Sequence, residues 1–331
     1  MEYIEIGDTG VRASRVGLGA WAIGGWMWGG TEEREAIATI HSALDRGITL
    51  VDTAAVYGYG NSEEIVGKAL AGERRAKAVL ATKVGLDWTD DGKVFRNSGK
   101  ARIAKEIDDS LRRLQTDYID IYQVHWPDPL TPIEETAAAM KALLDAGKIR
   151  AIGVSNYSAA QMEAFRVVAP LHTSQPPLNL FERAAQTEVL PYCAEHGIVG
   201  MTYGALCRGL LSGRVTRERA FTGDDLRGRD PKYQEPRFSQ YLAAVEALDA
   251  LARERYGKRV IDLAVRWLLE QPGVGIALWG ARKPAQLDDV EGAMGFTLDR
   301  ATLADIDGIL TATIHDPVGP EFMAPPARSA A

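Results

Sequence analysis

The chain has 331 residues, of which 46% are hydrophobic and 25% are charged, and its formal net charge is −7. These proportions are typical of a folded globular protein, and the mild acidity argues against a nucleic-acid-binding surface or a basic membrane-binding helix. The two cysteines form no CxxC pair, which argues against a disulfide framework. No signal-peptide pattern or apolar run of transmembrane length is visible, so a cytoplasmic protein is expected.

The first part of the chain alternates between strand and helix patterns. A β-hairpin is predicted over residues 3–6 and 11–14, and a buried strand follows over 15–19. A helical pattern then leads to a second apolar run, which ends as a strand at Asp52. Asn61 and the glutamate three positions later have the spacing of a capping box, so the next helix is expected to begin there.

The same alternation continues through the rest of the chain. Further apolar runs predict strands over residues 78–83, 118–125, 151–155, 173–175, 198–202 and 275–278. Helical patterns cover residues 32–45, 62–70, 100–114, 133–146, 159–169, 187–195, 239–255, 260–270 and 283–294. Continuous apolar strands are typical of parallel sheets buried on both faces. Eight βα units in a chain of this length favour an α/β fold of the (β/α)8 TIM barrel type over a doubly wound sheet.

One domain over residues 1–331 is predicted, because no linker, repeat or low-complexity segment divides the chain. The N-terminal hairpin would precede the barrel, and a long loop with an extra helix would follow the seventh strand. Residues 317–331 are rich in proline and alanine and are expected to form an irregular tail.

Polar residues gather at the predicted strand ends. Asp52, Lys83 and His125 occupy three of these ends, and Tyr57 lies in the loop after Asp52. In a barrel the C-terminal ends of the strands share one face, where catalysis takes place. A single lysine or histidine at such a place is usually solvated or structural, but four converging residues favour a common chemical task.

These four side chains suit proton donation to a carbonyl oxygen. A tyrosine, with a pKa of about 10, donates efficiently near neutral pH if that pKa falls by about 2–3 units. A lysine ammonium about 4 Å away contributes roughly 4 kcal/mol at an effective dielectric constant of about 20, which is sufficient. We therefore predict Tyr57 as the acid, Lys83 as the residue that lowers its pKa and Asp52 as the counterion of Lys83. His125 would orient the substrate oxygen.

A hydride donor is then required, and it must be a cofactor. The Gly-Leu-Gly motif at 17–19 has no third glycine in place, so a Rossmann site is not supported. A barrel can bind phosphate at the loops after strands seven and eight, here residues 203–209 and 280–284. Arg282 and Lys283 stand at the predicted helix start, and arginine grips phosphate well. Since no acidic residue for a bare ribose is evident there, NADP(H) is favoured and NAD(H) stays possible.

Taken together, these motifs resemble those of the aldo-keto reductases. Residues 206–213 are similar to a bacterial branch that includes polyol and glycerol dehydrogenases and inositol- or stress-linked reductases. The matching segments are DTA at 52–54, YG at 57–58, SE at 62–63, TK at 82–83, VHW at 124–126, GVSN at 153–156, QPPLNLFER at 175–183, YGAL at 203–206 and GAR at 280–282 with Gln286.

The resemblance implies a barrel that binds NADP(H) without a Rossmann fold, and a catalytic tetrad of Asp52, Tyr57, Lys83 and His125. The chain departs from the family at Val290, where many members carry an asparagine that contacts adenine. The residues implied to bind the cofactor are Ala20, Trp21, Asp52, Ser155, Asn156, Gln175, Tyr203, Gly204, Ala205, Leu206, Cys207, Arg208, Arg214, Arg227, Gly280, Ala281, Arg282 and Gln286.

Six of the seven tryptophans fall in predicted strand-end loops. Aromatic walls suit small carbonyl compounds and the faces of sugars or polyols. The residues expected to face the substrate are Trp21, Trp26, Tyr57, Trp88, His125 and Trp126. The identity of the substrate, the direction of the reaction and the oligomeric state stay open.

Three other functions compete with this interpretation. A class I aldolase would use Lys83 as a Schiff-base nucleophile, but it would leave Tyr57 beside Asp52 unexplained. A cofactor-sensing or regulatory subunit with little turnover is an open alternative, because a fold does not fix a function. A metal-dependent hydrolase is disfavoured, because the five histidines form no HxH pair and only His125 lies at a strand end.

Overall fold

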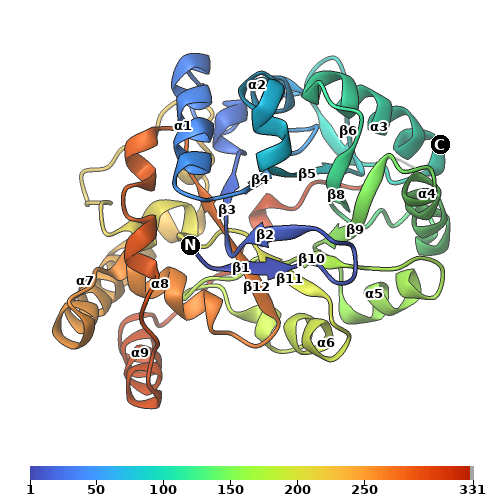
Figure 1. Ribbon diagram of the computed structural model, residues 1–331. Helices are drawn as coiled ribbons and strands as arrows, with labels where there is room; N and C mark the ends of the chain where they lie inside the picture. The colour runs from blue at the N-terminus through green and yellow to red at the C-terminus, as the bar shows by residue number, and fades with distance from the viewer. Residues whose placement is uncertain (329–331) are drawn as a thin grey trace.

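The computed structural model describes residues 1–328 and has a closed barrel of eight parallel strands at its centre (Figure 1). Around the barrel the strands follow the order β10, β11, β12, β3, β4, β5, β8 and β9, which closes on itself. The predicted (β/α)8 barrel is therefore confirmed. The strands are β3 (Val16–Gly19), β4 (Leu50–Asp52), β5 (Val79–Val84), β8 (Ile119–Val124), β9 (Ile149–Ser155), β10 (Thr173–Gln175), β11 (Val199–Thr202) and β12 (Val274–Gly280).

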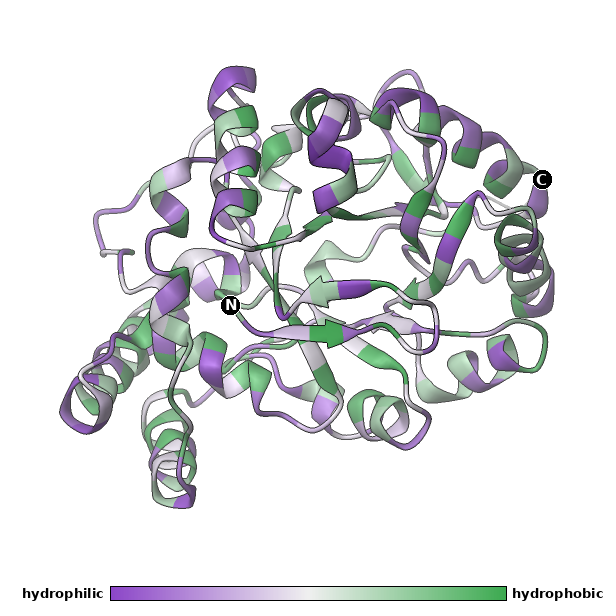
Figure 2. Cartoon of the chain, in the orientation of Figure 1, coloured by the Kyte–Doolittle hydropathy of each residue, from purple (hydrophilic) through white to green (hydrophobic). Residues whose placement is uncertain are grey.

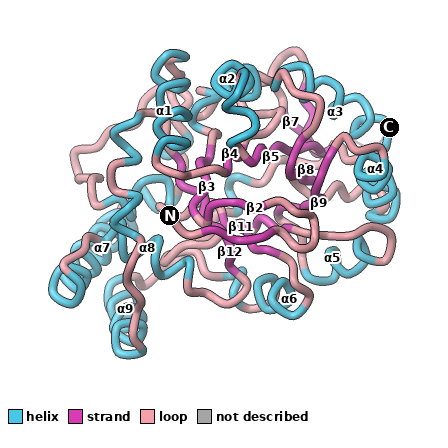
Figure 3. Tube along the Cα trace, viewed as in Figure 1, coloured by secondary structure: helices cyan, strands magenta, loops and turns pink. Residues whose placement is uncertain are grey.

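Helices surround the barrel on its outside (Figure 3). Both apolar and polar stretches run along them, as expected for helices with one face on a core and one in water (Figure 2). In the described residues none of them is both long enough and apolar enough to cross a membrane. They are α1 (Glu33–Asp45), α2 (Asn61–Leu70), α3 (Lys100–Leu114), α4 (Ile133–Asp145), α5 (Ala159–Arg166), α6 (Val189–Glu195), α7 (Arg237–Tyr256), α8 (Val260–Leu269) and α9 (Arg300–Thr313).

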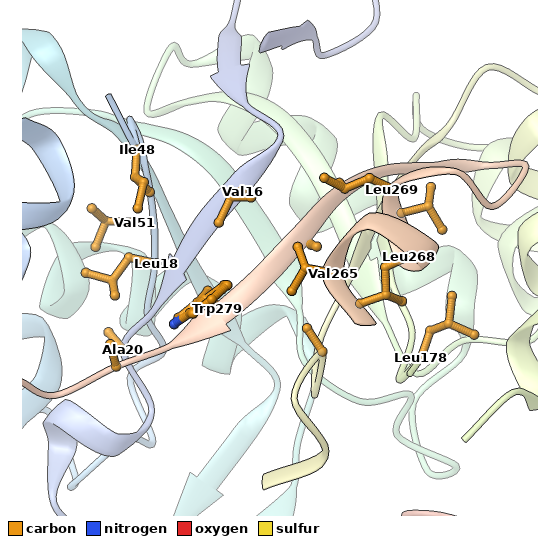
Figure 4. Packing of buried hydrophobic residues seen from close by; sticks show 14 of the residues in the cluster. Val16, Leu18, Ala20, Ile48, Val51, Leu178, Val265, Leu268, Leu269 and Trp279 are labelled. Carbon is orange, nitrogen blue, oxygen red and sulfur yellow. The ribbon is translucent and has the colours of Figure 1, made fainter. Parts of the chain in front are cut away.

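Two layers of apolar packing hold the strands in register. The larger layer lies between the strands and the helices; Figure 4 shows part of it, including Leu18, Val265 and Trp279. The smaller layer fills the inside of the barrel, where Leu50 and Ile276 are fully buried. Every residue of β5 and β8 is buried, which explains why these strands appear as continuous apolar runs.

The hairpin of β1 (Tyr3–Glu5) and β2 (Arg12–Ser14) is antiparallel, as predicted. Residues from this region, including Ile6 and Ala13, belong to the apolar cluster inside the barrel. The N-terminal hairpin therefore closes the end of the barrel that is opposite to the strand C-termini.

One predicted helix and one predicted helix cap are wrong. Residues 283–294 form two short 3-10 helices, η7 (Pro284–Leu287) and η8 (Val290–Ala293), instead of one α-helix. The second approaches α8 so closely that a Cβ on Gly292 would lie 2.2 Å from the Asp262 carboxylate, so packing overrides the helical pattern. Helix α2 begins at Asn61, as predicted, but the capping box does not form: Gly60 is the N-cap residue, and the Asn61 amide donates to the Gly24 carbonyl instead.

The structure also contains elements that were not predicted. A hairpin of β6 (Leu86–Trp88) and β7 (Val94–Arg96) follows β5, and α9 follows the barrel. The extra helix predicted after the seventh strand is α7, which is preceded by a long connection from β11. The tail predicted over residues 317–331 is largely irregular in its described part, with one 3-10 turn, η9 (Glu321–Met323). Residues 329–331 of that prediction lie outside the described residues.

Candidate active site

A buried lysine, Lys83, connects two of the other residues predicted for catalysis, Asp52 and Tyr57. Lys83, in β5, donates from Nζ to Asp52 Oδ1 at 2.5 Å, to the Thr53 carbonyl at 2.9 Å and to Tyr57 Oη at 3.3 Å. The lysine side chain is fully buried, and its three donors each have an oxygen partner. An ammonium held in this way is poorly suited to act as a Schiff-base nucleophile, which argues against the aldolase alternative.

The Tyr57 ring is fixed by aromatic and backbone contacts. It stacks on Trp21 with ring centroids 6.0 Å apart, and His125 meets it edge-on at 5.6 Å. The loop that carries Tyr57 crosses the loop after β3 at two glycines, where a Cβ on Gly58 would lie 2.3 Å from the Gly24 carbonyl oxygen. Gly58 also has a φ of 64°, so both sterics and backbone conformation require glycine there.

The electrostatics of these residues differ from the prediction. Burial, with a further contribution from the Asp52 carboxylate, raises the pKa of Tyr57 well above its ordinary value. The predicted net fall in the pKa of Tyr57 is therefore wrong, because burial dominates the shift. Burial also lowers the pKa of Lys83, against the opposing effect of Asp52, and burial together with Lys83 holds the pKa of His125 well below 6.5. Tyr57 thus keeps its proton, and the His125 imidazole is neutral.

The second oxygen of Asp52 is held by two amides. Gln175 Nε2 donates to Asp52 Oδ2 at 2.9 Å, and Gln123 Nε2 donates to the same oxygen at 3.2 Å. Gln123 was missed by sequence reasoning, although a glutamine inside the buried run of β8 was a visible signal. The two amides fix the carboxylate so that its other oxygen faces Lys83.

A second hydrogen-bonded group lies beside the tetrad. Asn156, with a left-handed φ of 61°, donates from Nδ2 to the His125 carbonyl and to Ser155 Oγ, both at 3.0 Å. Tyr203 Oη donates to Asn156 Oδ1 at 3.0 Å, and Ser155 Oγ donates to the Gln175 carbonyl at 2.8 Å. The structure therefore brings together Ser155, Asn156, Gln175 and Tyr203, four of the residues that the family resemblance implied for cofactor binding.

The loop after β11 forms a curved stretch of backbone, residues 204–209, which we call the 204–209 arc. Positive φ values occur at Gly204 (74°), Cys207 (45°), Arg208 (53°) and Gly209 (108°). Consecutive turns of this kind form concavities that suit anions. The Arg208 side chain pairs with Glu182 and Asp230, so the backbone of the arc, not this guanidinium, is available to a phosphate.

These residues surround one cavity of about 660 Å³. Six arginines line it, and all of them come from the segments that follow β11 and β12: Arg208, Arg214, Arg219, Arg227, Arg229 and Arg282. A different set of residues, apolar or aromatic, lines the cavity from other segments: Trp21, Trp26, Val56, Leu86, Val94, Trp126, Phe322, Met323, Ala324, Pro325 and Pro326. The cavity thus has one set of walls rich in cations and another set without charge.

The loop after β12 is well ordered by its own contacts. Gln286 Oε1 accepts from the backbone N–H groups of Arg282 at 2.9 Å and Lys283 at 3.1 Å. The Arg282 guanidinium donates to the Trp28 carbonyl at 2.6 Å. Arg214 pairs with Asp289 at 2.8 Å, so Arg214 and Arg282 both lie on the cavity and are held by other groups, whereas Lys283 pairs with Glu35 and does not line it.

Some predicted residues do not line the cavity. Trp88 packs against the Tyr59 ring at 5.9 Å and under the Arg102 guanidinium, so the prediction that it faces substrate is corrected. The side chains of Ala20 and Cys207 are fully buried behind the cavity wall. From the sequence alone, a tryptophan in a predicted loop could not be assigned either to the cavity wall or to packing outside the cavity.

The sequence left the role of the C-terminal tail open, and in the structure the tail forms part of the uncharged wall. The Arg96 backbone N–H donates to the Pro326 carbonyl at 3.0 Å, and Arg96 Nε donates to the Pro325 carbonyl at 2.9 Å. The same guanidinium lies 4.9 Å from the centre of the Trp126 ring. Arg96 therefore joins the tail, the β6–β7 hairpin and the loop after β8.

Known proteins are similar to this chain in both sequence and architecture. Residues 15–311 match the Aldo/keto reductase family. The chain is 62% identical over 329 residues to the aldo-keto reductase YhdN of Bacillus subtilis, covering 99% of each chain. It is 36% identical to the NADH-specific methylglyoxal reductase of Escherichia coli, covering 91% of this chain and 96% of that protein. The structure of the glycerol dehydrogenase AKR11B4 from Gluconobacter oxydans superimposes with a TM-score of 0.88 at 52% identity, covering 97% of this chain and 99% of the other.

Proposed function

The chain belongs to the aldo/keto reductase family, and we propose that it interconverts small, uncharged aldehydes or ketones and their alcohols, with NADP(H) as the hydride carrier. The observation that carries this proposal is the contact of Lys83 with both Asp52 and Tyr57, next to His125, on the wall of the cavity. A buried phenol beside a buried ammonium is suited to passing a proton to and from a substrate oxygen.

The residues of the cavity fit a nicotinamide cofactor. The 204–209 arc offers closely approachable backbone to a pyrophosphate, and Gly280 leaves open space where any Cβ would stand. Arginines suit the phosphate groups, including a 2′-phosphate. The residues proposed to hold the cofactor are Ser155, Asn156 and Gln175 at the amide, Tyr203 against the ring, the arc at the pyrophosphate, and Arg214, Arg227, Arg282 and Gln286 toward the adenosine.

When bound, the nicotinamide supplies or accepts the hydride. Tyr57 holds its proton at Oη, and Lys83, 3.3 Å away, stabilises the tyrosinate that forms as the proton leaves. A unit charge at that distance contributes about 5 kcal/mol at an effective dielectric constant of about 20. Asp52 keeps Lys83 charged, and the neutral His125 imidazole is able to donate one N–H to the substrate oxygen.

The walls of the cavity suggest the class of substrate. Apart from Asp52, which is already engaged by Lys83, the described residues of its tryptophan- and tail-lined walls include no carboxylate, lysine or arginine to recognise a charged substrate. Small carbonyl compounds and polyols need only aromatic surfaces and the proton donor. The names of two similar proteins, a glycerol dehydrogenase and a methylglyoxal reductase, support substrates of this size.

Steady-state kinetics with NADPH and NADH, against aldehydes, ketones and polyols of graded length, test the proposal. We expect turnover of short neutral carbonyls, with kcat/KM for NADPH at least about tenfold above that for NADH, as one lost phosphate contact would give. Preference for NADH, as the name of the Escherichia coli relative suggests, would refute the NADP(H) part alone. Tight NADPH binding without turnover of any carbonyl would overturn the enzyme assignment and favour a cofactor sensor.

A further inference from the structure

Lys232 is a fully buried lysine that has no part in the proposed proton transfer. It belongs to η6 (Pro231–Tyr233), in the long connection between β11 and α7. Its Nζ lies 2.8 Å from Glu182 Oε1 and donates to the Gly319 carbonyl at 3.2 Å. A lysine buried so completely costs free energy unless its charge is paired, so its two partners indicate what it holds together.

One of these partners is the centre of a buried ion cluster, which we define as Glu182, Arg208, Asp230 and Lys232. Glu182 Oε1 also accepts from Arg208 Nη2 at 2.6 Å, and Arg208 Nε donates to Asp230 Oδ2 at 2.5 Å. Two cations and two anions make the ion cluster neutral. Although burial acts to raise the pKa of Glu182, Arg208 and Lys232 together hold it below its ordinary value, so the carboxylate stays charged.

The ion cluster holds both ends of the 204–209 arc. At one end, Asn179 Nδ2 donates to Glu182 Oε2 at 2.7 Å and to the Gly204 carbonyl at 3.0 Å. At the other end, Tyr233, which follows Lys232, donates from Oη to the Arg208 carbonyl at 3.0 Å. Non-glycine residues with positive φ, such as Arg208, cost free energy and persist only where their surroundings fix them. The ion cluster and its neighbours supply that constraint.

The other partner of Lys232 is the base of the C-terminal tail. Gly319 lies just before the residues that line the cavity from Phe322 to Pro326. The Phe322 ring lies 5.5 Å from the Arg208 guanidinium, and the Val318 backbone N–H donates to Tyr241 Oη at 3.3 Å. The tail therefore meets the ion cluster at two points, Gly319 at Lys232 and Phe322 at Arg208, and Lys232 contacts both sides of the junction.

We propose that Lys232 is a positioning residue that couples the 204–209 arc to the C-terminal tail, so that NADP(H) bound at the arc orders the wall that receives the substrate. This inference rests on the proposed function. The coupling acts through Glu182, whose carboxylate is shared by the arc and by Lys232, and through the Gly319 carbonyl. By linkage, a tail held in place also favours cofactor binding.

Hydrogen exchange of the backbone amides in residues 318–328, with and without saturating NADPH, tests the coupling directly. In the wild-type protein we expect NADPH to slow exchange in the tail by about fivefold, the lower range of site-to-site coupling. In Lys232→Met, exchange should be faster and should no longer respond to NADPH, and the Kd for NADPH should rise by the same factor. Lys232→Arg, which keeps the charge and the donors, should restore most of the response.

Lys148→Met is the matched control, because Lys148 pairs with Asp108 on the surface and should leave both quantities unchanged. The inference is overturned if NADPH does not change the amide exchange rate of the tail in the wild-type protein. It is also overturned if NADPH still slows tail exchange in a folded Lys232→Met variant. Should Lys232→Met fail to fold, Lys232→Gln gives the same comparison, since it keeps a donor but not the charge. Absence of NADPH binding in the wild-type protein would instead refute the proposed function.

Discussion

The proton-donating end and the phosphate end of the cavity are built in different ways. Asp52 and Lys83 belong to neighbouring barrel strands, and strand pairing sets their positions, with Asp52 opposite Ala81 and Lys83 opposite Gln123. The 204–209 arc and Arg282 lie on loops, where no strand register fixes them. There the positions depend on side-chain contacts, such as those of the ion cluster beneath the arc.

This difference in construction indicates which property, catalysis or cofactor affinity, a substitution at each end should change. At the proton-donating end the backbone is set by the barrel, so a conservative substitution should change the chemistry and leave cofactor binding intact. At the phosphate end the side chains both hold the loops and meet the cofactor, so a substitution should change affinity first. Substitutions at the two ends should therefore separate catalysis from cofactor binding.

The largest effect is expected for Tyr57→Phe. The variant keeps the ring contacts with Trp21 and His125 but removes the proton donor. We expect carbonyl reduction to fall by about 10³-fold, within the range of general-acid catalysis, while the Kd for NADPH changes by less than about twofold. Stopped-flow or steady-state turnover, together with fluorescence titration of NADPH, measures both. Retained turnover would contradict the role given to Tyr57, and lost NADPH binding would contradict the separation of the two ends.

The next effect is expected at the phosphate end, with Arg282→Ala. Loss of a charge-assisted hydrogen bond costs about 1.5–3 kcal/mol, so the Kd for NADPH should rise about 10- to 100-fold. NADH lacks the 2′-phosphate and should be weakened much less, while kcat at saturating cofactor should hardly change. Because Arg282 also donates to the Trp28 carbonyl, equal weakening of both cofactors would mean that it only orders the loop.

The same division between strands and loops decides what could be predicted from the sequence. The (β/α)8 barrel and the residues at its strand ends followed from apolar periodicity, because continuous apolar runs such as that of β5 are typical of parallel strands buried on both faces. The helix predicted over 283–294 failed, because its geometry is set by the approach of Gly292 to Asp262 in α8. That contact joins segments distant in sequence and leaves no local signal.

Within the site, the residues that act through others were the hardest to predict. Gln123 and Lys232 are isolated polar residues in the sequence, and only the folded chain shows that each contacts a carboxylate. The direction of the Tyr57 pKa shift was also missed, because charge pairing with Lys83 does not account for the burial of the phenol. The sequence allowed us to predict which charged side chains pair with one another. It did not allow us to predict how deeply they are buried or which distant residues contact them.

Burial at the proton-donating end should also appear in the pH dependence of stability. The pKa of His125 is lowered by burial and by Lys83 in the folded protein, so the unfolded chain binds a proton more readily. Stability from this residue is therefore complete above pH 6.5 and is lost as pH falls below it, by up to about 1.4 kcal/mol per pH unit. Urea unfolding between pH 7.5 and about 5 should show a steeper loss for wild type than for His125→Asn. Parallel curves for the two proteins would show that His125 is not held neutral.

The smallest effect is expected for Trp88→Leu, and it defines where the substrate-facing wall ends. Trp88 packs on Tyr59 and Arg102 outside the cavity, whereas Trp126 lines the cavity beneath the Arg96 guanidinium. Trp126→Leu removes apolar surface from the pocket and should raise KM for a medium-length aldehyde about tenfold, within the 1–3 kcal/mol typical of such changes. Trp88→Leu should leave KM within about twofold, as for residues that do not touch substrate, although the melting temperature should fall. A matching rise in KM for both variants would show that the β6–β7 hairpin shapes the wall as a unit, so that Trp88 acts on substrate through its packing.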